Sequence, residues 1–381
     1  MTSVLITWKN LPKQKHVYTV FHNVIPKTYK HDKENCLVIP TRLDGDFSDQ
    51  ILITESTRKT LNFSGVGVAV TELPVLDDGD IVSIDCNRLV VVFNIKGCTN
   101  ALYVTNACNS KCQFCPQPSS PDNGGFYQIA KELISLVDDP TGSVNITGGE
   151  PTIQRKNFIS LLEHFSTVWP TTKAFVLTNG RLLCENSYVE DIYKAIPADR
   201  IAFGIPLYSD ASCIHDNIVG APGAFGQTIR GLYNLASKRA EIELRVVFSK
   251  LTYRRLPKLI QYVGRNLPFI TRIAIMGIEP MGFCRNNWDK FWIDPDDARE
   301  ILSDTFLEAK NFGLRVLLYN FQLCCLSQKL RKYACSTISE WKRVYTKECL
   351  YCPLKSDCGG FFASQISSYL PRRFYDNSKQ K

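Results

Sequence analysis

Short runs of β-branched and apolar residues, each followed by polar turn residues, dominate the first 97 positions of the chain. Turns such as Leu43–Asp46 and Asp77–Asp80 carry the Asp and Gly residues that favour tight reversals. The pattern predicts a small β-rich N-terminal domain over residues 1–97, built as a barrel or a sandwich. The predicted strands are Val17–Val20, Cys36–Ile39, Ile51–Thr54, Val66–Val70, Ile81–Ile84 and Leu89–Phe93.

From about residue 100 the pattern changes to apolar strand-like runs that alternate with amphipathic segments of helical period. Repeated strand–helix units predict a parallel sheet with right-handed crossovers. Six units are too few for a closed eight-fold barrel, so we expect an α/β fold with a partial (β/α)6 barrel over residues 98–319. The loops after its strands should carry the chemistry. The predicted strands are Leu102–Val104, Ser143–Ile146, Lys173–Leu177, Arg200–Gly204, Glu241–Phe248 and Arg272–Ile278.

The amphipathic segments between these strands predict the helices. They are Tyr127–Asp138, Asn157–Ser166, Phe225–Lys238 and Leu256–Arg265. A further helix should follow the last strand, with Asp294 as its N-cap and Pro295 in its first turn.

Composition narrows the class of protein. The chain has 381 residues, of which 44% are hydrophobic and 22% charged, so it can bury a sizeable core. Apolar runs fall short of the roughly 18–20 residues that a membrane-spanning helix needs. The first residues lack a secretory signal, so we expect a cytoplasmic protein without a membrane partner. The net charge of +8 is mild and favours a solvated mixed surface, with no nucleic-acid partner.

The chain has fifteen cysteines, and because a reducing compartment disfavours disulfides, their number favours metal or cluster ligands among them. Three of these cysteines fall within eight residues, as C-x3-C-x2-C, directly after the first predicted barrel strand: Cys108, Cys112 and Cys115. Three thiolates on one tight loop can hold three irons of a [4Fe–4S] cluster and leave the fourth iron open. A zinc site would need a fourth ligand, and Asn109, Lys111 and Gln113 offer none.

This spacing, with aromatic Phe114 just before the last cysteine, resembles the signature of radical S-adenosylmethionine (SAM) enzymes. The resemblance implies that Cys108, Cys112 and Cys115 hold the catalytic cluster and that its open iron binds the methionine part of SAM. It also implies reductive cleavage of SAM to a 5′-deoxyadenosyl radical, which abstracts a hydrogen from the substrate. Phe114 would help to position SAM.

A second match follows the second predicted barrel strand. Gly148, Gly149, Glu150 and Pro151 resemble the family's GGEP motif, although a plain βα turn gives the same letters. The Glu150 carboxylate can accept hydrogen bonds from an ammonium group, which the resemblance identifies as the methionine amine of SAM.

Further candidates follow later strands. Thr178 and Asn179 resemble the family's ribose-contact position. Arg245 is a candidate for the SAM carboxylate or ribose, with an outward-facing salt bridge as the competing interpretation. His215 and Glu279 follow strands and can reach the substrate entrance, but hydrogen bonding within their loops is the competing role.

The resemblance extends to one subgroup, the radical SAM maturase C of the His-Xaa-Ser system, over roughly residues 75–365. It implies that the substrate is a peptide with His-Xaa-Ser repeats and that a second radical SAM maturase accompanies this one. Cys284, Cys325 and Cys335 depart from the subgroup's pattern. The segments that resemble it include Ile205–Asp210, His215–Asp216, Gly223–Phe225, Thr228–Gly231, Arg245–Val247, Leu251–Tyr253, Met281–Phe283, Ser339–Lys342 and Cys358–Phe362.

The last segment, 320–381, is rich in cysteine. The spacing Cys349-x2-Cys352-x5-Cys358 resembles the middle of the SPASM cysteine pattern of peptide-modifying radical SAM enzymes. Phe362 stands where another cysteine would complete the pattern, so the segment is closer to the one-cluster "twitch" arrangement. With Cys324 as the upstream partner, four thiolates could ligate an auxiliary [4Fe–4S] cluster. Cys325 and Cys335 compete for that place, and a four-cysteine zinc site is the alternative.

Together these features predict a radical SAM enzyme that modifies a peptide after translation. A radical SAM enzyme acting on a small molecule, or a non-catalytic metal-binding scaffold for a partner maturase, are the alternatives. The positive net charge would suit an acidic flavodoxin or ferredoxin as electron donor.

Overall fold

A computed structural model describes residues 7–9, 17–22, 36–39, 51–55, 67–70, 76–85, 88–97, 99–140, 142–339, 342–365 and 370–371. The chain divides into two compact units. The first comprises residues 1–105, 123–147 and 156–174, and the second comprises 106–122, 148–155 and 175–381. All the candidate site residues lie in the second unit.

The N-terminal strands form one seven-stranded mixed sheet of order β1-β5-β4-β3-β2-β6-β7, not the predicted barrel or sandwich. Long connections join β2 to β3, β3 to β4 and β4 to β5, and each of these pairs is parallel, whereas Cys86 and Asn87 alone separate the antiparallel β6 and β7. The predicted strands themselves are present. They are β2 to β7, and β1 was not predicted. The bounds are β1 Thr7–Lys9, β2 Val17–His22, β3 Cys36–Ile39, β4 Ile51–Glu55, β5 Gly67–Val70, β6 Ile81–Asp85 and β7 Arg88–Phe93.

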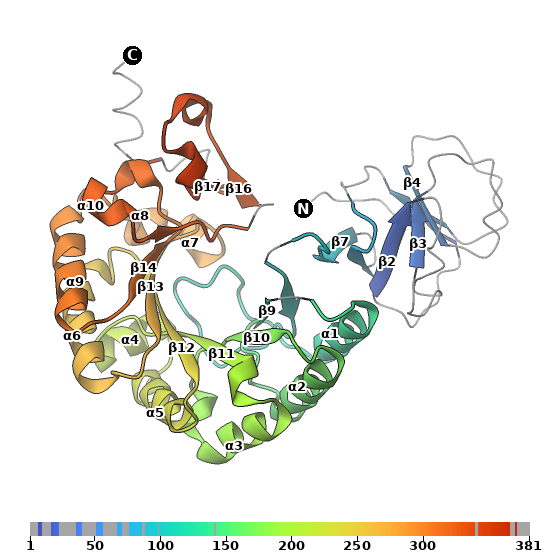
Figure 1. Cartoon of the computed structure of the whole chain (residues 1–381), viewed down its shortest axis with the longest axis horizontal. Coiled ribbons are helices and arrows are strands. Elements are labelled where there is room, and N and C mark those ends of the chain that lie inside the picture. Colours follow the sequence, from blue (N-terminus) through green and yellow to red (C-terminus); the bar gives the residue numbers. More distant parts are fainter. Residues whose placement is uncertain are drawn as a thin grey trace. The chain divides into compact units, whose positions relative to one another are not determined.

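The following strands form an eight-stranded parallel sheet, a partial barrel of order β15-β14-β13-β12-β11-β10-β9-β8 (Figure 1). The expected α/β class is confirmed, and its six predicted strands match β8 to β13. β14 and β15 extend the sheet beyond the prediction. The bounds are β8 Ala101–Tyr103, β9 Ser143–Thr147, β10 Lys173–Leu177, β11 Ile201–Pro206, β12 Glu241–Phe248, β13 Arg272–Gly277, β14 Val316–Tyr319 and β15 Ala334–Cys335.

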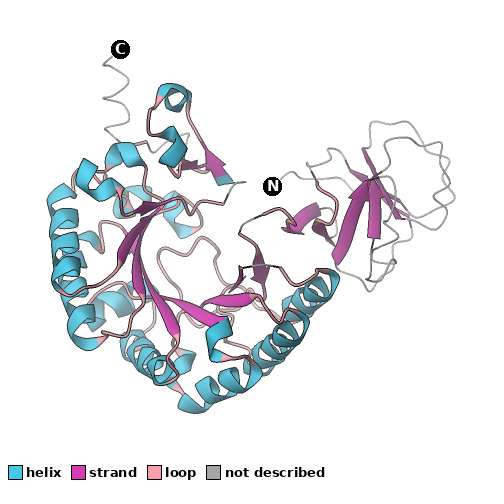
Figure 2. Ribbon diagram, viewed as in Figure 1, coloured by secondary structure: helices cyan, strands magenta, loops and turns pink. Residues whose placement is uncertain are grey.

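Helices follow the strands as the alternating pattern predicted, and Figure 2 shows this alternation through the second unit. Two helices after β10 and β11, α3 and α4, were not anticipated. The bounds are α1 Gly125–Leu136, α2 Arg155–Val168, α3 Asn186–Ala195, α4 Ser212–Val219, α5 Ala224–Ser237, α6 Leu256–Asn266, α7 Phe283–Asn286, α8 Trp288–Phe291, α9 Arg299–Asn311 and α10 Gln328–Arg331. Among described helices, none has the length and apolar character that crossing a membrane requires.

The helix expected to begin at Asp294 begins later, at Arg299. Asp294 instead closes a turn before the helix, where its Oδ1 accepts a hydrogen bond from Asp296 N at 2.9 Å. The side chain therefore satisfies a backbone donor, as a cap does, but in an Asx turn outside the helix.

Strand β12 shows how the sheet builds both a core and a site. Leu244, Val246 and Phe248 are buried on one face, in keeping with the two-residue period of a strand. Arg245 and Val247, on the other face, stay partly exposed. In Figure 1 helices α3, α5, α6 and α9 lie along the outer side of the curved sheet, so the apolar face packs beneath helices.

The cysteine-rich C-terminal segment has little regular structure. Its one described pair of strands is antiparallel, β16 Arg343–Val344 with β17 Phe361–Phe362. Short 3-10 turns lie between and before them, η5 Leu323–Cys325, η7 Lys347–Tyr351 and η8 Lys355–Asp357. Five of the C-terminal cysteines fall in or beside these turns: Cys324, Cys325, Cys349, Cys352 and Cys358.

Candidate functional site

The three-cysteine loop follows β8, and its thiols are partly buried. Burial raises the pKa of Cys108 to about 11 and that of Cys112 to about 12, and the charges of the neighbouring thiolates add to the rise at Cys112. Burial also raises the pKa of Cys115. The three thiols therefore lie close enough to interact, and a bound cation would have to displace their protons.

The end of helix α4 holds this loop in place. Val219 O accepts a hydrogen bond from Lys111 N at 2.9 Å, and Ile218 O accepts one from Gln113 N, also at 2.9 Å. The side chain of Gln113 adds a third bond, from its Nε2 to Asn217 O at 2.9 Å. The last carbonyls of a helix have no partner within the helix. Here the cysteine loop supplies three of the donors, two from its backbone and one from the side chain of Gln113.

Phe114 anchors the loop from its buried side. Its ring is 8% exposed and makes edge contacts with Tyr208 and Phe291, both at 5.5 Å between ring centroids. Such contacts add to the free energy gained by burial alone. In the structure Phe114 therefore supports the loop by packing. A contact of Phe114 with SAM stays a prediction.

The Gly-Gly-Glu-Pro segment lies against the backbone of the cysteine loop. Glu150 N donates to Ala107 O at 2.8 Å. A Cβ at Gly149 would lie 2.3 Å from Ala107 O and 2.8 Å from Asn106 O. Only glycine permits such a close approach of two backbones.

The carboxylate of Glu150 joins the loops that follow β9 and β10. It is fully buried, and its Oε1 accepts hydrogen bonds from Thr152 N at 3.0 Å and Thr152 Oγ1 at 2.6 Å. Oε1 also accepts from Thr178 Oγ1 at 2.5 Å, and Oε2 accepts from Asn179 N at 2.7 Å. Glu150 is therefore a positioning residue in this structure, and its contact with a SAM amine stays a prediction.

Asn179 and Arg181 extend this network to the cysteine loop. Asn179 Nδ2 donates to Asn109 Oδ1 at 2.6 Å. Arg181 donates to the carbonyl oxygen of Asn109 and, from its Nη1, to Ser110 Oγ at 3.0 Å. Its Nε donates to Gln227 Oε1 on α5 at 2.7 Å. Sequence reasoning missed Asn109 and Arg181, although Arg181 follows the Thr178–Gly180 motif directly.

Arg245 pairs with a buried carboxylate. Its Nε lies 3.6 Å from Glu243 Oε1, and Glu243 is 3% exposed, so the pair does not face outward as the competing interpretation supposed. Glu243 also binds Arg272 Nε at 2.6 Å and Tyr319 Oη at 3.0 Å. Burial lowers the pKa of Arg245, and the charge of Glu243 opposes that change. A contact of Arg245 with SAM stays a prediction.

His215 is placed as a structural residue. It is 1% exposed, and its Nδ1 accepts a hydrogen bond from Tyr208 N at 3.2 Å. Its ring centroid lies 5.8 Å from that of Tyr208, which in turn contacts Phe114. The adjacent Asp216 accepts hydrogen bonds from Gly223 N and Phe225 N, each at 2.7 Å, and so caps α5. Both residues take part in local hydrogen bonding, the competing role considered for His215.

The buried position of His215 predicts a pH dependence of stability. Burial lowers its pKa from 6.5 to about 4, so the unfolded chain binds this proton more readily than the folded chain. The resulting stability is present above pH 6.5 and is lost as the pH falls towards 4. From pH 7 to pH 5 we expect a loss of about 2 kcal/mol in the free energy of unfolding.

Urea unfolding of the metal-free chain at the two pH values measures this loss. His215→Gln, which keeps a hydrogen-bond acceptor but does not titrate, should show a smaller difference between pH 7 and pH 5. An equal difference in the variant and the unchanged chain would assign the pH dependence to other groups.

The segment after β13 touches the cysteine loop and the C-terminal segment. A Cβ at Gly282 would lie 2.3 Å from Cys115 O, and Cys284 Sγ donates to Gln113 O at 3.6 Å. Glu279 forms an ion pair with Lys342 at 3.3 Å. Gly282 and Cys284 were not among the sequence-predicted site residues.

Several of the C-terminal cysteines come together. Burial raises the pKa of Cys358, and the charges of Cys324 and Cys349 add to that rise. Hydrogen bonds from the backbone of Leu323 and Gly360 to the sulfur oppose it. Cys352 ends turn η7, which contains Cys349. Four predicted ligands thus lie on neighbouring turns of one segment.

The donor set fits iron–sulfur chemistry. Within the described ranges, no three His, Cys, Asp or Glu side chains converge as the ligands of a single metal ion. In a [4Fe–4S] cluster each ligated iron takes one thiolate. The three partly buried thiols of the loop can therefore hold three of the four irons. The alternative of four-cysteine zinc at the C-terminal segment stays open.

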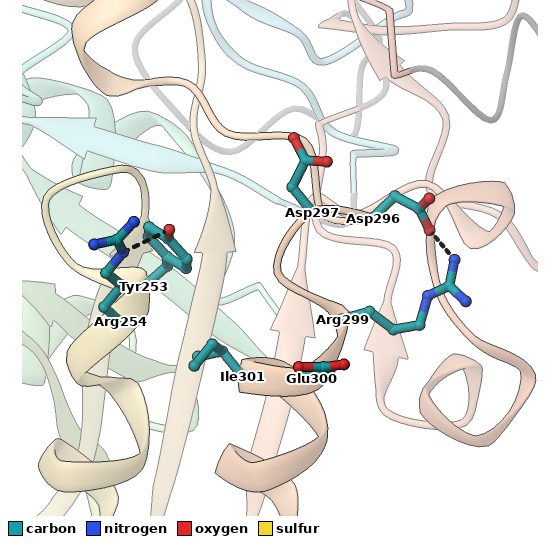
Figure 3. A pocket seen from close by; sticks show the side chains of 7 residues that line it. All are labelled: Tyr253, Arg254, Asp296, Asp297, Arg299, Glu300 and Ile301. Atoms are coloured by element: carbon teal, nitrogen blue, oxygen red, sulfur yellow. Dashed lines mark hydrogen bonds and ion pairs between the residues drawn. The ribbon is translucent and has the colours of Figure 1, made fainter.

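A pocket of about 620 Å³ lies elsewhere in the second unit, between η4 Tyr253–Arg255 and the start of α9 (Figure 3). Charged side chains dominate its lining, and Arg299 pairs with Asp296 at 2.5 Å. It contains none of the sequence-predicted site residues.

Comparisons with known proteins find similarity over the strands that carry the site. The family model of the radical SAM superfamily matches residues 102–263. Of curated proteins, the antilisterial bacteriocin subtilosin biosynthesis protein AlbA of Bacillus subtilis (strain 168) is 33% identical over 130 residues, 33% of this chain and 28% of AlbA. GTP 3′,8-cyclase of Haemophilus influenzae (strain 86-028NP) is 34% identical over 100 residues, 25% of this chain and 29% of the cyclase.

Solved structures support the fold. Streptococcus suis SuiB bound to S-adenosylmethionine aligns with a TM-score of 0.51 and 18% identity, covering 71% of this chain and 73% of SuiB. Native anSMEcpe with bound AdoMet aligns with a TM-score of 0.51 and 15% identity, covering 74% of this chain and 94% of that one. The matches to both curated relatives span less than a third of their length.

Proposed function

We propose that the chain is a radical SAM enzyme that cleaves SAM reductively and modifies a peptide with His-Xaa-Ser repeats. The observation that carries the proposal is the interlocking of three loops within the radical SAM domain. Gly149 packs on the backbone of the cysteine loop, Glu150 binds Asn179, and Asn179 binds Asn109. Such rigid support is what an active site needs to hold its groups in place.

In this proposal Cys108, Cys112 and Cys115 hold a [4Fe–4S] cluster, and Gly148 to Pro151, Thr178, Asn179, Phe114 and Arg245 surround SAM. The bound cofactors supply a low-potential electron and a 5′-deoxyadenosyl radical that removes a hydrogen atom from the substrate. The residues of the chain fix the thiols, exclude water and orient the substrate. Tyr208 and Phe114 contribute by closing the loop from below, where both are buried.

The peptide substrate is supported by the C-terminal cysteines and by the relatives. AlbA is by its name a bacteriocin biosynthesis protein, and the C-terminal segment brings Cys324, Cys349 and Cys358 together. With Cys352 these residues would hold an auxiliary [4Fe–4S] cluster. A second radical SAM maturase and a flavodoxin or ferredoxin donor complete the proposed set of partners.

A small-molecule substrate is the second candidate, because several curated relatives are GTP 3′,8-cyclases. The two candidates differ in their product. Incubation with SAM and reductant should change the mass of a His-Xaa-Ser peptide and leave GTP unchanged. A new nucleotide product with an unaltered peptide would favour the second candidate.

Removal of the three cysteines of the loop tests the cleavage itself. After anaerobic iron–sulfur reconstitution, the unchanged chain should convert SAM to 5′-deoxyadenosine. The variant Cys108→Ala/Cys112→Ala/Cys115→Ala should lose this activity, because no protein ligand would remain for the catalytic cluster. The control Cys213→Ala alters an exposed cysteine and should keep full activity. Cleavage by the triple variant would refute the mechanism. If the unchanged chain binds zinc and no iron, that result would favour the alternative of a non-catalytic metal-binding scaffold.

A further inference from the structure

Two adjacent cysteines in turn η5 differ in their surroundings. Cys325 is 3% exposed, whereas Cys324 is only partly buried. Their sulfur atoms lie 3.8 Å apart, within the range of an S–H···S hydrogen bond. One of the two thiols can therefore face a metal centre while the other donates to it from the protein side.

Turn η5 packs beside the Gly-Gly turn that follows Cys358. Gln322 Nε2 donates to Gly360 O at 3.0 Å, and Cys325 N donates to Gln322 O at 3.0 Å. Arg331 Nε donates to Leu323 O at 3.1 Å and holds the same turn from α10. These bonds fix the backbone that carries the two thiols against the segment that carries Cys358.

The proton of this contact belongs to Cys325. Cys325 is the enclosed thiol and Cys324 is the half-buried one, so Cys324 is the sulfur that a cluster can reach. A cysteine that ligates iron does so as a thiolate and has no proton to donate. In the contact of 3.8 Å between the two sulfur atoms, the donor is then the S–H of Cys325.

Cys335, the third candidate for the upstream ligand, belongs to the parallel sheet. It is the last residue of β15, paired with Tyr319 of β14, and its sulfur lies 4.0 Å from Tyr333 O. The charges near it are those of Arg315, Arg272 and Glu243, on the sheet. The contacts and charges that the structure gives for the Cys335 sulfur therefore come from the sheet and its edges, and none comes from another C-terminal cysteine.

We infer that Cys324 is the upstream ligand of the C-terminal cluster and that Cys325 is a positioning residue whose S–H donates a hydrogen bond to the ligating sulfur. The inference rests on the auxiliary cluster of the proposed function. A hydrogen bond to a ligating sulfur stabilises the more negatively charged, reduced cluster, and so raises its reduction potential. Cys325 would therefore set the potential of the cluster without binding iron.

The test uses the full chain with Cys108→Ala/Cys112→Ala/Cys115→Ala as background, so that only the C-terminal cluster contributes. Iron and sulfide per chain are measured, and the midpoint potential is obtained by redox titration followed by electron paramagnetic resonance. Cys325→Ala should keep its iron and show a more negative potential. Cys325→Ser keeps a donor and should restore the potential. Cys324→Ala should lose the iron, and the control Cys335→Ala should change neither quantity.

Each other outcome overturns the inference. Loss of iron from both Cys325→Ala and Cys325→Ser, with retention in Cys324→Ala, would make Cys325 the ligand while the auxiliary cluster stands. An unshifted potential in Cys325→Ala would remove its tuning role. Cys325→Val fills the same space without a donor and replaces Cys325→Ala if that variant does not fold. Zinc without iron in the background itself would refute the auxiliary cluster, and the inference with it.

Discussion

Glu150→Gln should lower the free energy of unfolding by about 3 kcal/mol, because one buried amide would replace a carboxylate that accepts four hydrogen bonds. Glutamine has two N–H donors in place of one oxygen. In one orientation of the amide its N–H groups would face Asn179 N. In the other they would face the donors of Thr152 and Thr178. A buried donor that faces another donor loses its bond and its solvation together.

Urea unfolding of the metal-free chain measures this loss at neutral pH. Glu132→Gln makes the same chemical change on α1, where Glu132 meets Gln128 at 3.2 Å on the exposed surface, and should stay within about 0.5 kcal/mol of the unchanged chain. Reconstituted Glu150→Gln should also cleave SAM far more slowly, since the loops after β9 and β10 would separate. Equal stability of the two variants would mean that the buried carboxylate is not what joins the loops.

Gly282→Ala should disrupt the cysteine loop although it replaces none of the proposed ligands. The added Cβ would lie 2.3 Å from Cys115 O and 2.8 Å from Pro116 O, both backbone atoms that cannot rotate away. The backbone at Gly282 also has φ 54°, a left-handed value that residues with a Cβ rarely adopt. We expect a loss of about 1–3 kcal/mol in stability and loss of iron from the first site.

Iron per chain and thermal unfolding provide the measurements for Gly282→Ala. Gly226→Ala is the matched control, because that glycine lies inside α5 with no atom within 4 Å of the added Cβ. It should keep its iron and should be as stable as the unchanged chain or slightly more so, since alanine favours a helix. If Gly282→Ala binds iron as fully as this control, the segment after β13 does not shape the loop.

The central strands β11 to β13 could be predicted from sequence because each is a run of ordinary length in which at least half of the residues are buried. β12 is one example, predicted as Glu241–Phe248 and found with the same bounds. β15 has two residues, Ala334 and Cys335, and so short a strand has no periodicity to detect. The N-terminal strands were found as well, but their order depends on pairings between distant residues, which local patterns do not encode.

For the candidate site, too, local sequence patterns predicted some features, while contacts between distant residues could not be predicted. Motif spacing located Cys108 and Glu150, since ligands and turn glycines stand at fixed distances along the chain. It did not reveal that Glu150 binds Thr178 or that Gln113 binds helix α4, because these partners come from different loops. It also could not separate Cys324 from Cys325, whose difference is one of enclosure.

The support from α4 has a consequence for synthesis of the protein. The carbonyls of Ile218 and Val219 that hold Gln113 and Lys111 belong to residues translated about a hundred codons after the cysteines. Gly282, which packs on Cys115, is translated later still. Domains fold as units while the chain emerges. A nascent chain thus carries its three thiols on an unsupported loop for much of translation, and under the proposed function iron would be loaded after the barrel has left the ribosome.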